Sequence, residues 1–145
     1  MYRYLVLILF FVSCNSTKKL PENPKETHNV SFKILEKGGH SGITEPVNMI
    51  WRNSKEINEF HKKNGIPKNE FAIDFNKSVL GGIFLGQQST GGFTIKIDKI
   101  IESDDSLKVY YSVQTGKIAI MVITQPYVIF MMPKTNKPVE FILLK

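Results

Sequence analysis

The stretch FTIKIDKIIESDDSLKVYYSV, residues 93–113, alternates apolar and polar side chains on both sides of a polar turn. The apolar positions recur with a period of two, first from Phe93 to Ile97 and then from Leu107 to Val113. This period is typical of antiparallel strands that bury one face and wet the other. The segment ESDDS, residues 102–106, holds Ser and Asp, which favour turns by bonding to nearby backbone. Two antiparallel strands joined by a turn are therefore predicted.

Further strands are predicted on both sides of this pair. Residues 30–37, 47–52 and 79–85 have short strand patterns, and PVEFILL, residues 138–144, follows a turn near the end of the chain. The run KIAIMVITQPYVIFMMPK, residues 117–134, differs because it is apolar on both faces except at Thr124 and Gln125. Such a segment must be buried on both sides or must cover a partner.

One helix is predicted, over NSKEINEFHKKNG, residues 53–65. Asn53 is placed to cap it, Glu56 completes a capping box, and Gly65 ends it. Ile57 and Phe60 are spaced to face a sheet. The chain is thus expected to be α+β and mainly β, with antiparallel strands in a curled sheet or small sandwich and one packed helix.

The N-terminal residues predict an envelope lipoprotein. Residues 1–13 combine one basic residue with an apolar run too short to span a bilayer, as in a signal peptide. The ending FVSC resembles a lipobox, which makes Cys14 the expected lipidation site and the membrane attachment. Residues 14–29 form the lipidated cysteine and a flexible tether, and residues 30–145 a single domain. The absence of an acidic cluster in residues 15–19 favours the periplasmic side over the cell surface.

No arrangement of residues predicts a catalytic or metal site. His28, His40 and His61 lack the paired spacing of metal ligands. Asp104 and Asp105 lie side by side in the predicted turn, where a structural role accounts for them. No cofactor is expected, and an envelope enzyme is the least favoured reading. The net charge of +6 is spread along the chain without a nucleic-acid-binding signature, so no nucleic acid partner is expected.

The loop GQQSTGG, residues 86–92, connects two predicted strands and has part of the glycine spacing of a phosphate-binding loop. The first and second glycines of a P-loop have counterparts in Gly86 and Gly91, but Gly92 replaces the lysine and Phe93 the hydroxyl residue. A strand follows rather than a helix, so no helix dipole faces the loop. Either a plain strand connection or a recognition loop remains.

Several motifs give residues 70–144 a family resemblance. They include the strand ending FLG at residues 84–86, the tip STGGF at residues 89–93, and the stretch TQPY at residues 124–127, which leads to Pro-Lys and to KPVEF at residues 137–141. In this order they resemble the C-terminal domain of the protease complex subunit PrcB family. Ser89 and Phe93 stand where that family commonly has proline and tyrosine.

The resemblance implies a small lipoprotein that stabilises an envelope protease complex rather than a protease. It makes the tip and the Pro-Tyr pair the expected contacts with a protein partner, for which a secreted protease is the candidate. These residues are Gln87, Gln88, Ser89, Thr90, Gly91, Gly92, Phe93, Pro126 and Tyr127.

GQQSTGGF, residues 86–93, also resembles the tip loop of chagasin-type cysteine-protease inhibitors, with residues 125–127 as a partial match to a second loop. A protease inhibitor is therefore the alternative function.

Overall fold

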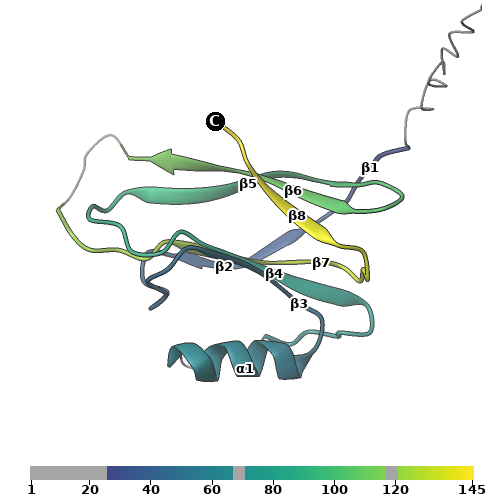
Figure 1. Ribbon diagram of the computed structural model, residues 1–145, viewed down its shortest axis with the longest axis horizontal. Coiled ribbons are helices and arrows are strands. Elements are labelled where there is room, and N and C mark those ends of the chain that lie inside the picture. The colour runs from purple at the N-terminus through teal and green to yellow at the C-terminus, as the bar shows by residue number, and fades with distance from the viewer. Residues whose placement is uncertain (1–25, 67–70, 117–120) are drawn as a thin grey trace, which may run out of the picture.

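Two four-stranded sheets lie face to face, and one helix covers the outer face of the second sheet (Figure 1). The computed structural model describes residues 26–66, 71–116 and 121–145. In chain order the elements are β1 (His28–Asn29), β2 (Lys33–Gly38), β3 (Val47–Trp51), α1 (Ser54–Asn64), β4 (Ser78–Phe84), β5 (Phe93–Glu102), β6 (Leu107–Thr115), β7 (Tyr127–Pro133) and β8 (Val139–Leu143). The expectation of a mainly β fold with a small sandwich and one packed helix is confirmed.

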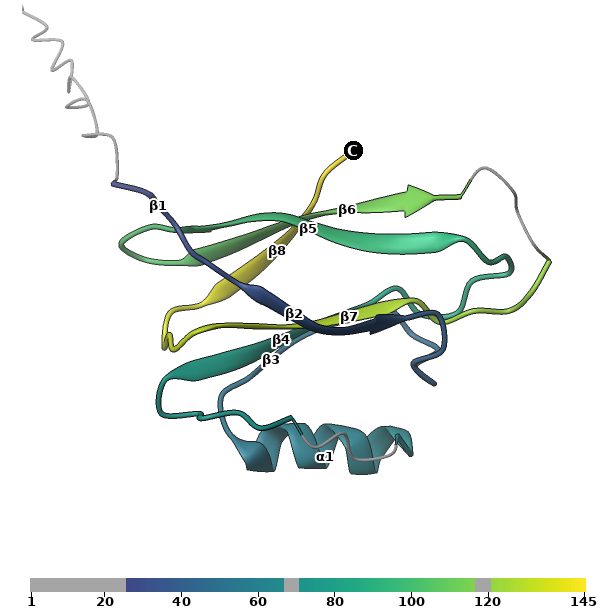
Figure 2. The same cartoon turned by 180° about the vertical axis from the view of Figure 1, so that it is seen from behind.

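The chain crosses between the two sheets at both ends of the sandwich, since the β7–β8 connection lies opposite the β4–β5 connection (Figure 1). The first sheet has the order β1-β5-β6-β8 and the second β2-β7-β4-β3, so the chain leaves β4 for β5 in the other sheet and returns from β6 to β7 (Figure 2). The predicted pair of strands in residues 93–113 is confirmed as β5 and β6, which are antiparallel. Their turn is closed by the Ser103 N–H, which donates to the Ser106 carbonyl oxygen.

One strand pair is parallel, although antiparallel strands were expected throughout. β8 pairs with β6 in parallel, with Leu107 opposite Val139. Parallel neighbours require a crossover connection. Here β7 supplies it, because the chain runs from β6 into the second sheet and returns in β8 with the direction that β6 had.

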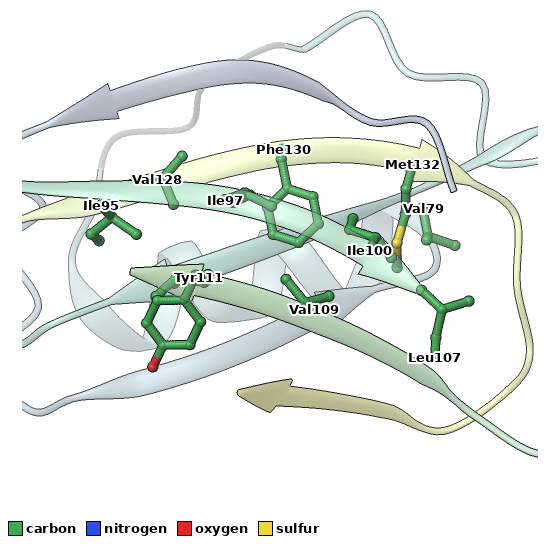
Figure 3. Close-up of a cluster of buried hydrophobic side chains, with 11 residues drawn as sticks. Val79, Ile95, Ile97, Ile100, Leu107, Val109, Tyr111, Val128, Phe130 and Met132 are labelled. Atoms are coloured by element: carbon green, nitrogen blue, oxygen red, sulfur yellow. The ribbon is translucent and has the colours of Figure 1, made fainter. Parts of the chain in front are cut away.

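An apolar core fills the space between the sheets (Figure 3). The second sheet contributes Val128, Phe130 and Met132 of β7, among other residues. The first sheet contributes residues that include Ile100 and Val109, which pack against them. Along β5 the buried positions change from Ile95 and Ile97 to Ile100. The register shift between Ile97 and Lys99 explains this change, since one extra residue in a strand moves the following side chains to the other face.

A second apolar cluster lies between the second sheet and α1. Alternate residues of β7, Ile129 and Met131, belong to this cluster together with Leu80 and Phe84 of β4. Both central strands of the second sheet are therefore buried on both faces. Residues 117–134 were predicted either to be buried on both sides or to cover a partner. β7 is buried on both sides, whereas residues 121–123 are exposed and residues 117–120 lie outside the described residues.

The helix begins and ends where the sequence predicts. The Asn53 side chain accepts from the Glu56 N–H, and Gly65 takes a left-handed conformation with φ 66°. The Glu56 carboxylate accepts from the Asn53 side-chain amide at 2.8 Å and from the Arg52 N–H at 2.7 Å, so it reaches one residue further back than a standard capping box. Ile57 faces the sheet as expected, and it is buried.

The sheet begins before residue 30. His28 pairs with Glu102 and Asn29 with Ile101, so the last two residues of the expected tether lie in β1. Residues 1–13, Cys14 and the tether up to residue 25 lie outside the described residues. No helix in the described part of the chain has the length and apolarity needed to cross a membrane.

Candidate functional site

The loop between β4 and β5 is a crossover between the sheets rather than a hairpin. It turns at Gly86, where φ is 71° and a Cβ atom would lie 2.7 Å from the Thr44 carbonyl oxygen. The next N–H, that of Gln87, donates to this same oxygen at 2.8 Å. Only glycine combines this conformation with so close an approach of backbone, so Gly86 fixes the base of the loop.

The loop pairs with the segment that precedes β7. The Gln88 N–H donates to the Thr124 carbonyl oxygen at 2.8 Å, and the Thr124 N–H donates back at 3.0 Å. The buried Thr124 hydroxyl also donates to the Thr90 carbonyl oxygen at 2.9 Å. Two of the motifs that carry the family resemblance, separated by about 35 residues, are thereby held together at one end of the sandwich.

The predicted contact residues differ in what they offer to a partner. Gln87, Ser89 and Gly92 are exposed, whereas Gln88, Thr90, Gly91 and Phe93 are half-buried. Gly92 has a φ of 89°, and its carbonyl oxygen accepts from the Gly116 N–H. Pro126 is fully buried, and its carbonyl oxygen accepts from the Leu85 N–H. Pro126 thus positions the loop, and the exposed polar tip is the part that a partner can reach.

An exposed apolar segment lies next to this tip. Met121, Val122 and Ile123 are 95%, 43% and 57% exposed, and they directly precede the Thr124 that pairs with Gln88. Sequence reasoning did not single them out, because they belong to the apolar run 117–134 that was read as one buried or partner-covering stretch. The sequence signal that could have revealed their exposure is the length of the run, because residues 117–134 are more than one strand usually contains. We call Gln87–Phe93 together with Met121–Ile123 the tip surface.

Tyr127 packs in the apolar cluster under α1. Its ring is half-buried on the helix side of the second sheet, stacked on Phe84 with 6.0 Å between ring centroids. Its hydroxyl donates a hydrogen bond to the Glu36 carboxylate. Burial raises the pKa of Tyr127 to about 12, and the carboxylate adds to the shift, so the phenol keeps its proton at neutral pH.

Two of the three histidines, His40 and His61, line one hollow between α1 and the second sheet. His28 lies in β1, and the backbone of His40 forms an isolated bridge with Gln125. His61, expected on the flank of the helix, is only 5% exposed. Burial lowers the pKa of His61, which the nearby Glu36 carboxylate opposes. In residues 26–66, 71–116 and 121–145, no group of three His, Cys, Asp or Glu side chains is placed to hold a metal ion.

Comparison with known families agrees with the motifs. The family model for the PrcB C-terminal domain matches residues 82–133, from the middle of β4 to the end of β7. The matched region contains both parts of the tip surface, and it confirms the resemblance seen in the sequence. The KPVEF motif at residues 137–141 lies beyond the match. No curated protein and no solved structure matches the chain.

Proposed function

We propose that the chain, whose residues 82–133 match the family model for the PrcB C-terminal domain, is a non-catalytic protein-binding module that stabilises a protease complex in the bacterial cell envelope. In this proposal a lipid on Cys14 anchors the chain, and the tip surface contacts the partner, a secreted protease.

The exposure of Met121, Val122 and Ile123 is the observation that carries the proposal. Three consecutive apolar side chains in water are unfavourable at about 25 cal/mol for each Å² of apolar area. Apolar surface bordered by polar residues is typical of protein contact sites. Here the polar border is the tip, with Gln87 and Ser89 exposed beside it.

The position of the tip surface suits an anchored binding module. β1 pairs with the Glu102 end of β5, whereas the tip adjoins the Phe93 end, so the described chain enters the sandwich opposite the tip (Figures 1 and 2). A tether leading to Cys14 would therefore approach from that opposite end. The tip surface would then point away from the membrane, towards a partner in the periplasm.

The test is affinity capture from envelope extract with the anchored chain, followed by mass spectrometry and activity-based labelling of proteases. We expect a protease to be captured, and we expect Met121→Asp to reduce its yield at least fivefold, because a charge would have to be buried in the contact. Leu143→Asp is the matched control, since Leu143 is an exposed apolar residue of β8 that does not belong to the tip surface. The Cys14→Ser variant should move the chain from the membrane fraction to the soluble fraction.

The same experiments distinguish a stabilising subunit from the alternative function, a protease inhibitor. Capture of a protease that stays active, with loss in Met121→Asp and not in Leu143→Asp, supports the proposal. Stoichiometric inhibition of a papain-like protease by the purified chain, relieved by Phe93→Ala, would instead indicate an inhibitor. Capture of abundant porins alone would contradict a protease complex.

A further inference from the structure

The outer edge of β3 lacks the features that usually keep a further strand from pairing with a sheet. In the described chain the edge strands of the two sheets are β1, β8, β2 and β3. β1 has two residues, β8 carries the charged Glu140, and β2 combines three charged residues with a register shift. Short length, charge and bulges protect sheet edges. β3, with the sequence VNMIW, has five residues without a charge, a proline or a register shift.

The pairing of β4 with β7 shows which way the main chain of the second sheet points. At one end of this ladder the Leu85 N–H donates to the Pro126 carbonyl oxygen at 3.0 Å, and at the other end the Lys134 N–H donates to the Lys77 carbonyl oxygen at 2.9 Å. Main-chain groups alternate in direction along a strand. The odd-numbered residues of β4 therefore bond to β7, and the even-numbered ones bond to β3.

The same alternation assigns the main chain of β3. The even-numbered residues of β4 lie opposite Val47, Met49 and Trp51, which therefore bond to β4. The N–H and C=O groups of Asn48 and Ile50 point the other way, and no other strand in the described ranges pairs with them. An extended polypeptide offers donors and acceptors at the spacing that these groups require.

A groove of about 1020 Å³ lies beside this edge, between β3 and α1. Its apolar lining includes Ile43, Val47, Met49 and Phe60. Pockets for small ligands usually measure about 300–1,000 Å³, so this groove has room for several side chains. Val47 and Met49 belong to the cluster on the helix side of the second sheet. A strand added to β3 directs every second side chain to that side, and hence into the groove.

The charges along the groove favour a basic partner, although the chain itself has a net charge of +6. Glu45, Glu56 and Glu59 line the groove together with Arg52 and Lys63. The Arg52 guanidinium donates to two carbonyl oxygens between β7 and β8, at 3.4 and 3.1 Å. Glu59 has an exposed ion pair of 3.8 Å within α1, and such pairs are weak. The carboxylates thus outnumber the cations, and a basic side chain in the groove is attracted to them.

We propose that the outer edge of β3 binds an extended segment of another protein as an added antiparallel strand, whose apolar and basic side chains enter the groove between β3 and α1. The main chain of the segment bonds to Asn48 and Ile50. Antiparallel pairing is chosen because it is slightly more stable for each residue than parallel pairing. The edge contains no residue of the tip surface, so its test and the test of the proposed function can fail separately.

The test uses the full chain in non-ionic detergent, with the amide signals of Asn48 and Ile50 observed by NMR. The probe is the peptide acetyl-Thr-Lys-Thr-Val-Thr-Lys-Thr-amide, whose valine and lysines share one face when it is extended. We expect saturable shifts of both amide signals. The same peptide with glutamate in place of lysine should bind about fivefold more weakly or less, because its charge has the sign of the carboxylates in the groove.

Two N-methylated forms of the peptide test the main-chain pairing. With the valine opposite Met49, the threonines on either side of it lie opposite Asn48 and Ile50, and their N–H groups point to β3. Methylation of these two threonine nitrogens should abolish binding. Methylation of the valine nitrogen should preserve it, because that N–H points away from β3. Equal loss with both peptides, or the reverse pattern, would overturn the proposal.

A substitution in β3 tests the edge from the side of the protein. Asn48→Pro removes an N–H that points outward and leaves the bonds to β4 in place, and proline is tolerated at such positions of edge strands. The Ile50 amide should then report binding of the lysine peptide that is about tenfold weaker or more. Asn48→Ala is the control, since it keeps the N–H and should keep the affinity. Unchanged affinity in an Asn48→Pro chain whose melting temperature is preserved would contradict strand addition.

Discussion

Two adjacent glycines in β4, Gly81 and Gly82, allow large aromatic rings to pack closely against both faces of the second sheet. A Cβ atom at Gly81 would lie 2.1 Å from the ring of Phe130 in the core between the sheets. A Cβ atom at Gly82 would lie 2.6 Å from the ring of Trp51 on the helix side. Each glycine thus makes room for one large ring. The sequence shows the glycines in a strand, where they often mark a close approach, but not which ring approaches.

The Gly81→Ala substitution should therefore destabilise the protein by about 1–3 kcal/mol, as expected for an overpacked core. The Phe130 ring is fully buried and cannot move aside. Urea unfolding measures the effect. In a Phe130→Leu background the same substitution should cost less, because the clashing ring is gone. Gly39→Ala is the control, since nothing lies within 4 Å of its added Cβ, and a loss there as large as at Gly81 would refute the packing argument.

At the scale of elements, the helix could be predicted with its bounds, because its signals are local. Asn53, Glu56 and Gly65 act within the helix itself. The burial of His61 could not be predicted in the same way, because it depends on the sheet that the helix covers. The bulge in β5 is an intermediate case, since the change from Ile97 to Ile100 is visible in the sequence but the pairing that explains it is not.

The cap of α1 gives a prediction at this scale. Asn53→Ala removes the acceptor of the Glu56 N–H and the donor to the Glu56 carboxylate. We expect a loss of about 1 kcal/mol in the free energy of unfolding, as is usual for such caps. Lys55→Ala is the control, because its exposed ion pair with Glu59 spans 3.8 Å and contributes little. Equal losses in both variants by urea unfolding would show that the cap is not the cause.

At the scale of the whole molecule, the second sheet joins the two cores. β4 and β7 give alternate side chains to the core between the sheets and to the cluster under α1. If β4 or β7 separates from one core, the apolar side chains of the other core are exposed to water as well. The three layers should therefore unfold together, as small single domains usually do.

This cooperation can be measured with the single tryptophan, Trp51, which lies under the helix. Ile100→Ala opens a cavity between the sheets and should cost about 2–5 kcal/mol. Because the cores share strands, Trp51 fluorescence and far-UV circular dichroism should shift to the same lower urea midpoint. Thr94→Ala, at an exposed position of the same strand, should leave both midpoints unchanged. Separate midpoints in Ile100→Ala would show that the helix side unfolds independently.

By itself the sequence determined the strands around residues 93–113, the capped helix, the mainly β class and the family resemblance. These features depend on periodicity, turn and cap chemistry and short motifs, all of which act between near neighbours. Only the tertiary structure decided which sheet each strand joins, that β6 and β8 run parallel, and that Met121–Ile123 lie exposed beside the tip. It alone placed Glu36, His61 and Tyr127 around one hollow, because those contacts join residues far apart in the chain.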